Sequence, residues 1–143
     1  MKGPVQSFEV TYLVHATEDA GKIAGAVAGA FGITAPYESE ELQGHFGNTI
    51  SRVRVHLTGV DAEQALDELA WKLRTAARSQ LLEELGKRVD EHGALFIRFD
   101  KQSMVLGRLV FGEEDSVRVK VKPRAFLMKG SPQQLYSELL ERK

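Results

Sequence analysis

Four positively charged side chains occupy every second position of the short segment 116–124. They are Arg118, Lys120, Lys122 and Arg124, and Val117, Val119 and Val121 stand between them. Because successive side chains of a β-strand point to opposite faces, this spacing predicts a strand with the cations on one face and the valines on the other. The cations would repeat about 7 Å apart, at a rise of roughly 3.3 Å per residue, which suits the phosphates of a nucleic acid. The alternative interpretation is a solvated outer strand face, which its lysines keep soluble and protect from edge pairing.

Other basic side chains are expected to extend this surface if their strands are neighbours. Arg52 and Arg54 share the polar face of one predicted strand, Arg98 lies on the polar side of another, and Lys101 follows that second strand. Unpaired bases would also need aromatic rings on which to stack. The candidate rings are Phe46, Phe96 and Tyr37. Each of these side chains is more often a core residue than a binding platform.

The distribution of charge along the chain favours the same region. The net charge is −1 over 143 residues, so the protein is not basic throughout, as many nucleic-acid binders are. Residues 98–129 nevertheless carry eight basic and four acidic side chains, whereas residues 1–50 carry two basic and six acidic ones. The sequence therefore predicts a local patch for a polyanion.

No metal or cofactor site is predicted from the residue types and their spacing. The chain has no cysteine, and none of its four histidines has a partner at a spacing of four residues. There is no Walker loop, dinucleotide fingerprint or nucleophile elbow. An RNA-acting enzyme with His45 and Asp100 as acid–base residues is therefore the weakest alternative, and we expect a protein without catalytic activity.

The same features bear on where the protein works. The absence of cysteine is consistent with the cytoplasm, and the first seven residues contain no apolar stretch typical of a signal peptide. The most apolar helical segment, 20–35, is too short and too rich in alanine and glycine to cross a bilayer. We therefore expect a cytoplasmic protein with no membrane partner.

Periodicity predicts one α+β domain over residues 1–143, with helices packed on one face of a mostly antiparallel sheet. Thr17 is expected to cap the first helix and Asp61 the second, which is expected to break near residues 76–79. Ser131 and Pro132 open a final helix. The predicted strands are 5–16, 49–58, 94–100, 104–111 and 116–124, with an irregular or strand segment at 37–46, and the predicted helices are 17–31, 62–90 and 131–143.

Several sequence blocks resemble an archaeal family of small RNA-binding-domain proteins, commonly described as predicted exosome subunits. The blocks are Thr17-Glu18-Asp19, Leu42-Gln43-Gly44-His45-Phe46-Gly47-Asn48, Arg88-Val89-Asp90-Glu91, Arg98-Phe99-Asp100-Lys101-Gln102 and Leu106-Gly107. The resemblance runs from about Glu9 to Lys122 and leaves the C-terminal helix at 131–143 outside. It implies a fold similar to the ribosomal protein that binds 5S rRNA. It also implies RNA binding and a link to RNA processing through the exosome or RNase P.

The leading hypothesis is thus a non-catalytic RNA-binding protein, an accessory factor in RNA processing or degradation. Phosphates would lie on Arg118, Lys120, Lys122 and Arg124, and the surface would extend over Arg52, Arg54, Arg98 and Lys101. His45, Asn48 and Gln102 would contact bases or 2′-hydroxyls. The alternative is a protein-interaction subunit of an RNA-processing complex, whose basic strand docks an acidic surface or extends a partner's sheet.

Overall fold

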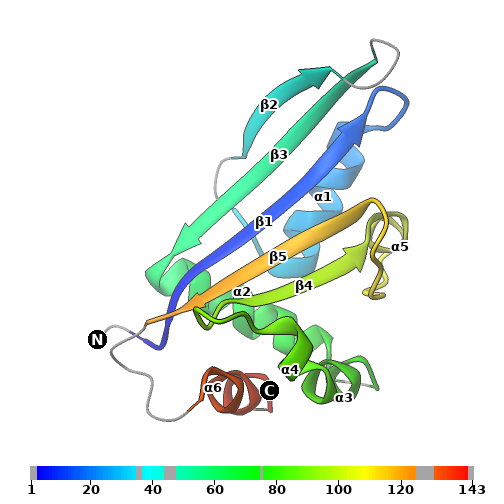
Figure 1. Cartoon of the computed structure of the whole chain (residues 1–143). Helices are drawn as coiled ribbons and strands as arrows, with labels where there is room; N and C mark the ends of the chain where they lie inside the picture. Colours follow the sequence, from blue (N-terminus) through cyan, green and yellow to red (C-terminus); the bar gives the residue numbers. More distant parts are fainter. Residues whose placement is uncertain (1–2, 35–36, 44–47, 75, 125–130, 142–143) are drawn as a thin grey trace.

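The fold is built on a five-stranded antiparallel sheet, seen in a computed structural model that describes residues 3–34, 37–43, 48–74, 76–124 and 131–141 (Figure 1). The strands are β1 (Val5–His15), β2 (Glu38–Gln43), β3 (Thr49–Thr58), β4 (Leu95–Asp100) and β5 (Ser116–Pro123). Their order across the sheet is β2-β3-β1-β5-β4. The basic strand β5 therefore pairs with β1 on one side and β4 on the other. Because β5 is an interior strand, the prediction that its lysines protect a sheet edge is wrong, and β5 cannot extend a partner's sheet. A solvated face of the strand is not contradicted.

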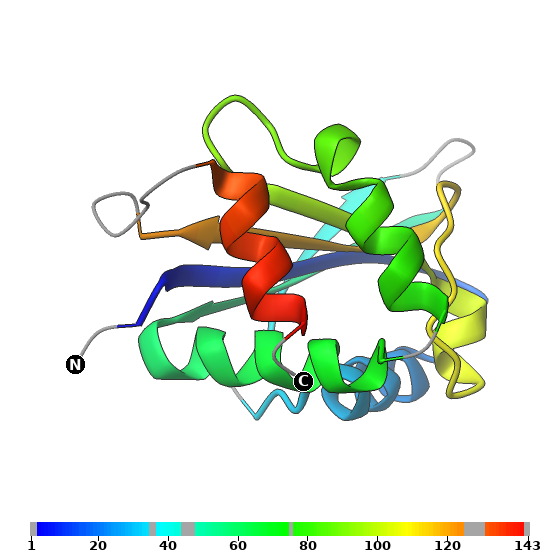
Figure 2. The ribbon, with the colours of Figure 1, turned by 90° about the horizontal axis from the view of Figure 1, so that it is seen from below.

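Within the described residues, helices cover one face of this sheet and none lies across the other, which we call the open face. They are α1 (Ala20–Phe31), α2 (Gly59–Lys72), α3 (Ala76–Glu83), α4 (Leu85–Arg88), α5 (Lys101–Val105) and α6 (Pro132–Glu141). Helices α1 and α2 lie behind the strands in Figure 1, and Figure 2 shows the sheet edge-on above them. Helices α3, α4 and α6 lie along the side of the molecule formed by β4 (Figures 1 and 2). The predicted α+β class, with helices on one face of an antiparallel sheet, is confirmed.

The core forms where the alternating strands meet the helices. Val117, Val119 and Val121 of β5 are at most 1% exposed and face the helices, as their spacing predicts. The buried stripe of α1 ends in Phe31, whose ring contacts Phe8 of β1 at 5.5 Å between centroids. Each fully buried side chain of this size stabilises the fold by about 1.5–3 kcal/mol. This burial holds β5 flat against the core and turns its even-numbered side chains outward.

The ends of α1 show which local signals were correctly identified. The helix is capped by Asp19, whose Oδ1 accepts a hydrogen bond of 3.1 Å from the Lys22 amide, so the prediction of Thr17 as the N-cap is wrong. A tight turn comes first, in which the Glu18 amide donates to the His15 carbonyl at 2.9 Å. The turn delays the helix by two residues. Gly32 ends the helix at a φ of 64°, as predicted.

The segment 104–111 is not a strand, which corrects the prediction from its apolar run. Asp100 caps the short helix α5 instead, because its Oδ2 accepts hydrogen bonds from the Ser103 amide at 2.9 Å and the Ser103 hydroxyl at 2.6 Å. Gly107, at a φ of 82°, follows the end of this helix. Only a single bridge, from Phe111 to Phe99, brings the segment back to the sheet within the described residues.

The long helical region divides into α2, α3 and α4. Helix α2 starts at Gly59 after Thr58, so Asp61 stands inside its first turn rather than at the N-cap. It ends at Lys72, a few residues earlier than the predicted break. The Arg74 amide donates to the Trp71 carbonyl at 3.3 Å, which tightens the last turn and closes the helix.

The C-terminal helix is part of the core. Tyr136 is fully buried, and its hydroxyl lies 2.6 Å from the Gly93 carbonyl oxygen and 3.1 Å from that of Val121, within hydrogen-bond distance of both. Ser131 accepts a hydrogen bond from the Gln134 amide and caps the helix as predicted. Among the residues described here, no helix has the length and apolar character needed to cross a membrane.

Candidate nucleic-acid interface

The open face of the sheet carries a group of basic side chains on β4 and β5, which we call the cationic strip. It consists of Arg98, Arg118, Lys120 and Lys122. Arg98 and Arg118 are direct cross-strand neighbours. All but the half-buried Lys120 are exposed. The alternation predicted for β5 is confirmed, and it places these cations on the open face of the sheet.

The cationic strip is not neutralised by ion pairs among the described residues, although Lys120 stands opposite Glu9 across the β1–β5 pair and helps to lower the pKa of Asp90. Within the described part of the chain, no carboxylate lies within salt-bridge distance of any of its four side chains. Like charges directly opposite each other on a sheet repel, as Arg98 and Arg118 must. The ammonium of Lys120 lies 5.3 Å from the centre of the Phe96 ring, a cation–π contact. An anion bound here would relieve the repulsion between the arginines.

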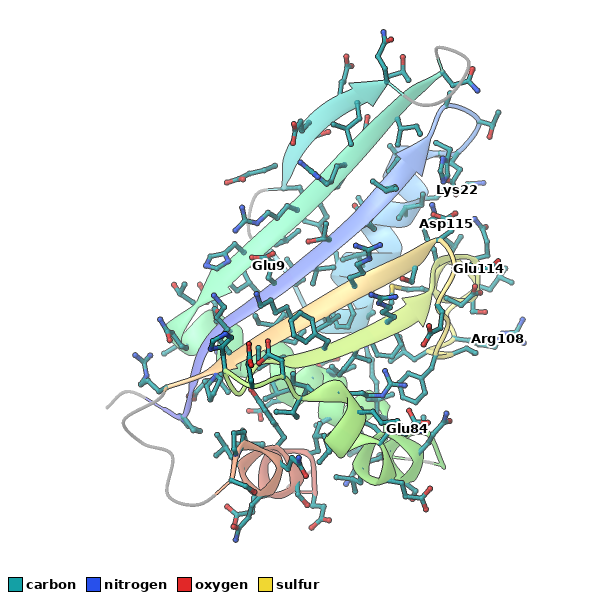
Figure 3. All side chains as sticks on the ribbon, viewed as in Figure 1. Glu9, Lys22, Glu84, Arg108, Glu114 and Asp115 are labelled. Atoms are coloured by element: carbon teal, nitrogen blue, oxygen red, sulfur yellow. The ribbon has the colours of Figure 1, made fainter. Side chains whose placement is uncertain are left out.

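The other half of the same face is different, because carboxylates neutralise its arginines. Arg52 pairs with Glu40 at 2.6 Å, and Arg54 pairs with Glu9 at 3.0 Å. The same Glu9 oxygen lies 3.1 Å from His56 Nδ1. Figure 3 shows Glu9 in the middle of the open face. The extended surface was expected only if these strands were neighbours, and β1 separates β3 from β5. Glu9 and Glu40 therefore confine the unpaired charge to the cationic strip.

The titration of Glu9 reflects this pairing. Partial burial alone would raise the pKa of Glu9, but hydrogen bonds from His56 and Arg54 outweigh it and bring the pKa below its usual value. Glu9 therefore carries its negative charge at neutral pH. Sequence reasoning overlooked it, although it alternates with Phe8 and Val10 and so had to lie on the polar face of its strand.

Two predicted contact residues, Lys101 and Arg124, lie apart from the cationic strip. Lys101 is only 1% exposed, so its expected place on the surface is wrong. Its ammonium donates to the Leu13 carbonyl at 2.7 Å, to Glu18 Oε1 at 2.8 Å and to Asp115 Oδ1 at 3.0 Å. The half-buried Arg124 donates from Nε to the Gly3 carbonyl at 2.9 Å. Both side chains thus hold segments of the fold together.

Two of the remaining predicted contacts, Gln102 and Asn48, lie toward one end of the sheet. Gln102 donates from Nε2 to Glu18 Oε2 at 2.9 Å, beside the turn between β1 and α1. Asn48 is exposed just before β3. His45 lies outside the described residues, as do Gly44 and Gly47 of the same block. Asn48 and Gln102 thus lie toward the end of the sheet where β1 ends at His15, which pairs with Ile50.

The three candidate aromatic rings have different positions. Phe96 is 39% exposed on the open face, among the residues of the cationic strip. Tyr37 is half-buried and donates its hydroxyl proton to the Ala24 carbonyl at 3.2 Å, so it packs against α1 rather than offering a free ring. Phe46 lies outside the described residues. Phe96 is thus the ring that the structure places on the candidate interface.

Three potential metal ligands come together beside Lys101. One atom each from His15, Glu18 and Asp115 lies within 4.8 Å of the others. The Lys101 ammonium bonds to both carboxylates and supplies the positive charge that a cation would bring. Burial would raise the pKa of Glu18, but hydrogen bonds from Lys101 and from the His15 amide outweigh this and lower it. The cluster is an ion-pair network that joins β1, α5 and the start of β5.

Comparisons with known proteins connect this geometry to a family. A family model described as RNA binding matches residues 7–123. The chain is 33% identical over 138 residues to the RNA-binding protein PAB1135 of Pyrococcus abyssi, and this match covers 90% of each chain. It is 30% identical over 121 residues to the uncharacterized protein MJ0213 of Methanocaldococcus jannaschii, and this match covers 77% of this chain and 79% of that protein.

A solved structure supports the same relationship. Mth689, a DUF54 protein from Methanothermobacter thermautotrophicus, is 26% identical, with a TM-score of 0.76 and coverage of 98% of both chains. The region matched by the family model, 7–123, contains the whole cationic strip, whereas Arg124 lies just beyond it.

Proposed function

Because this chain belongs to the archaeal family described as RNA binding, we propose that it binds RNA through the cationic strip. The observation that carries the proposal is the contrast between the two halves of the open face. Arg52 and Arg54 are paired with carboxylates, whereas Arg98 and Arg118 stand opposite each other without one among the described residues. Uncompensated cations on a rigid sheet attract phosphates and release their counterions.

The proposed role is that of a non-catalytic, cytoplasmic accessory factor in RNA processing or degradation, with the exosome or RNase P as partners. Three acidic side chains in or near the sequence blocks that resemble the family already have structural tasks, which supports a role without catalysis. Asp100 caps α5, while Glu18 and Asp115 hold the Lys101 ammonium. Purification of the full chain from cells, with and without ribonuclease, tests the partners. Exosome or RNase P subunits that remain after ribonuclease treatment would support a direct association.

RNA binding itself is tested by the salt dependence of affinity. Fluorescence anisotropy would follow the titration of labelled single-stranded RNA with protein at several salt concentrations. Four phosphate contacts predict that log affinity falls against log salt with a slope of about −3. Removing two cations in the variant Lys120→Gln/Lys122→Gln should reduce the magnitude of that slope by about 1.4.

Arg52→Gln is the matched control, since it removes a cation of the same face that is already paired with Glu40. We expect its slope to equal that of the wild-type protein. Equal effects of the two variants would show that the whole face attracts RNA non-specifically. The proposal is wrong if RNA fails to bind at low salt, and an acidic protein surface would then be the ligand to test.

A further inference from the structure

A groove of about 550 Å³ runs along the outer edge of β4, next to the cationic strip. Its volume is within the usual range for small-molecule sites, about 300–1,000 Å³. Helix α4 stands on the open-face side of this edge (Figure 2), and Glu84 marks the helical wall in Figure 3. The side chains that line the groove include Glu84, Arg88, Phe96, Arg98, Phe111 and Glu113.

The groove exists because β4 is covered at its two ends but not at its middle. A bridge from Val89 to Leu95 covers one end, and a bridge from Phe111 to Phe99 covers the other. At the second bridge, the Arg98 carbonyl accepts a hydrogen bond from Gly112 and the Asp100 amide donates one outward. The backbone of Phe96 alternates with these residues and so faces the same outer edge. Between the two bridges, no described strand pairs with this edge of β4.

One wall of the groove is the exposed ring of Phe96. This ring projects on the open face between two cations, with Arg98 two residues along the strand and Lys120 directly opposite. Because the Phe96 side chain is 39% exposed, the fold gains less hydrophobic stabilisation from it than full burial would give. Aromatic rings on a sheet surface are the usual platforms on which unpaired bases stack.

The other wall is a preorganised guanidinium group. Arg88 donates to Glu84 Oε2 from Nε at 2.9 Å and from a terminal nitrogen at 2.6 Å. Its guanidinium lies over the Phe111 ring at 4.8 Å, and Phe111 in turn stacks on Phe99 at 5.5 Å. Two hydrogen bonds and a ring therefore hold Arg88 in place. The planes of guanidinium groups also stack on bases.

We propose that this groove binds one unpaired RNA base, stacked on Phe96, while the neighbouring phosphates lie on the cationic strip. The inference rests on the proposed RNA binding and specifies the class of RNA, which is single-stranded or bulged. Bases in a continuous duplex are stacked on one another and cannot enter an edge groove. Stacking accepts every base, so affinity should vary little with sequence.

The test compares Phe96→Ala with Trp71→Ala on single-stranded RNA and on a duplex of equal length. Trp71 is the matched control because it is an exposed ring, at 50%, on α2, which covers the opposite face of the sheet. We expect Phe96→Ala to weaken single-strand binding by roughly 5- to 100-fold, the loss expected for one stacked base. Duplex binding and the salt slope should stay unchanged, and Trp71→Ala should bind as the wild type does.

The conservative variant Phe96→Tyr keeps an aromatic ring and should restore single-strand binding, which separates stacking from any effect on folding. The base site is overturned if Phe96→Ala binds single strands like the wild type, or if Trp71→Ala or duplex binding suffers the same loss. In those cases the slope change of the Lys120→Gln/Lys122→Gln variant still upholds phosphate binding. A wild-type protein that binds no RNA would overturn the proposed function and, with it, the base site.

Discussion

Lys101 shows how a residue that looks like a surface cation can become part of the core. A buried ammonium is tolerated only where its lost hydration is replaced by hydrogen bonds and opposite charges. Here a carbonyl and two carboxylates supply them, at 2.7 to 3.0 Å. The sequence places a lysine directly after a strand, but it contains no sign that Glu18 and Asp115, 83 and 14 positions away, bind its ammonium group.

Replacing Lys101 by methionine should lower the free energy of unfolding by about 2–3 kcal/mol. Loss of one partner from a fully buried pair costs about 3–5 kcal/mol, and the cost is smaller here because the Asp115 side chain is 43% exposed. Urea unfolding measures the change. Gln102→Ala is the control, because it removes only an exposed hydrogen bond to the same Glu18 and should cost less than about 0.5 kcal/mol. Equal losses in the two variants would contradict the structural role of Lys101.

The lowered pKa of Glu18 predicts a pH dependence of stability. A carboxyl group whose pKa is lower in the folded state stabilises the fold fully above its unfolded pKa, about 4.5. This contribution is lost as the pH falls from that value through the folded pKa. Glu18→Gln should therefore be less stable than the wild type at pH 7, and the difference should shrink as the pH falls below about 4.5. Urea unfolding from pH 7 to pH 3 measures it, and a constant difference would rule out the linkage.

At the scale of single elements, the start of α1 allows a direct comparison of two capping candidates. Asp19→Ala removes the side chain that accepts from the Lys22 amide and should lower the free energy of unfolding by about 1 kcal/mol. Thr17→Ala changes an exposed residue of the preceding turn and should have little effect. Thermal or urea unfolding of both variants gives the answer. If Thr17→Ala were the more damaging change, the helix would begin two residues earlier than the structure shows.

Elements with a regular pattern over many residues could be predicted from the sequence, whereas those decided by one contact could not. The alternation of β5 and the stripe Ile23, Val27 and Phe31 of α1 each have one solution that buries their apolar side chains. The run 104–111 is apolar enough for a strand, but the Asp100 cap and the turn at Gly107 direct the chain into α5. Capping energies of about 1 kcal/mol decide such cases, and composition does not reveal them.

For the molecule as a whole, the face of the candidate site was predictable and its extent was not. The alternation of side chains along β5 places Lys120 and Lys122 on the open face whatever the order of the strands. Which charges stand beside them depends on that order. Glu9 faces His56 on one side and Lys120 on the other only because β1 lies between β3 and β5. Periodicity along one strand contains no information about its neighbours.

The carboxylates of the open face should therefore limit how much of it attracts RNA. The variant Glu9→Gln/Glu40→Gln releases Arg52 and Arg54 from their ion pairs. We expect tighter binding at low salt and a steeper salt slope, by up to about 0.7 for each arginine that gains a phosphate. The anisotropy titration described above measures both quantities.

A control for net charge is available on α6, away from the open face. Glu138→Gln/Glu141→Gln removes two negative charges from the C-terminal helix. Its salt slope should match that of the wild type. If both double variants changed the slope equally, overall charge rather than its placement on the sheet would govern binding.

The interior position of β5 also determines which partner adapts on binding. Its backbone is hydrogen-bonded to β1 and β4, so the amide hydrogens of Val117 to Val121 should exchange with solvent only when the whole fold opens. Bound RNA can add little protection to a strand that is already so slow to exchange. The backbone positions that carry the charges are fixed in advance, so we expect a bound nucleic acid to bend its own backbone to match. On the proposed mode of binding, we expect this surface to favour flexible RNAs, because a stiff RNA would bear the full energetic cost of that adjustment.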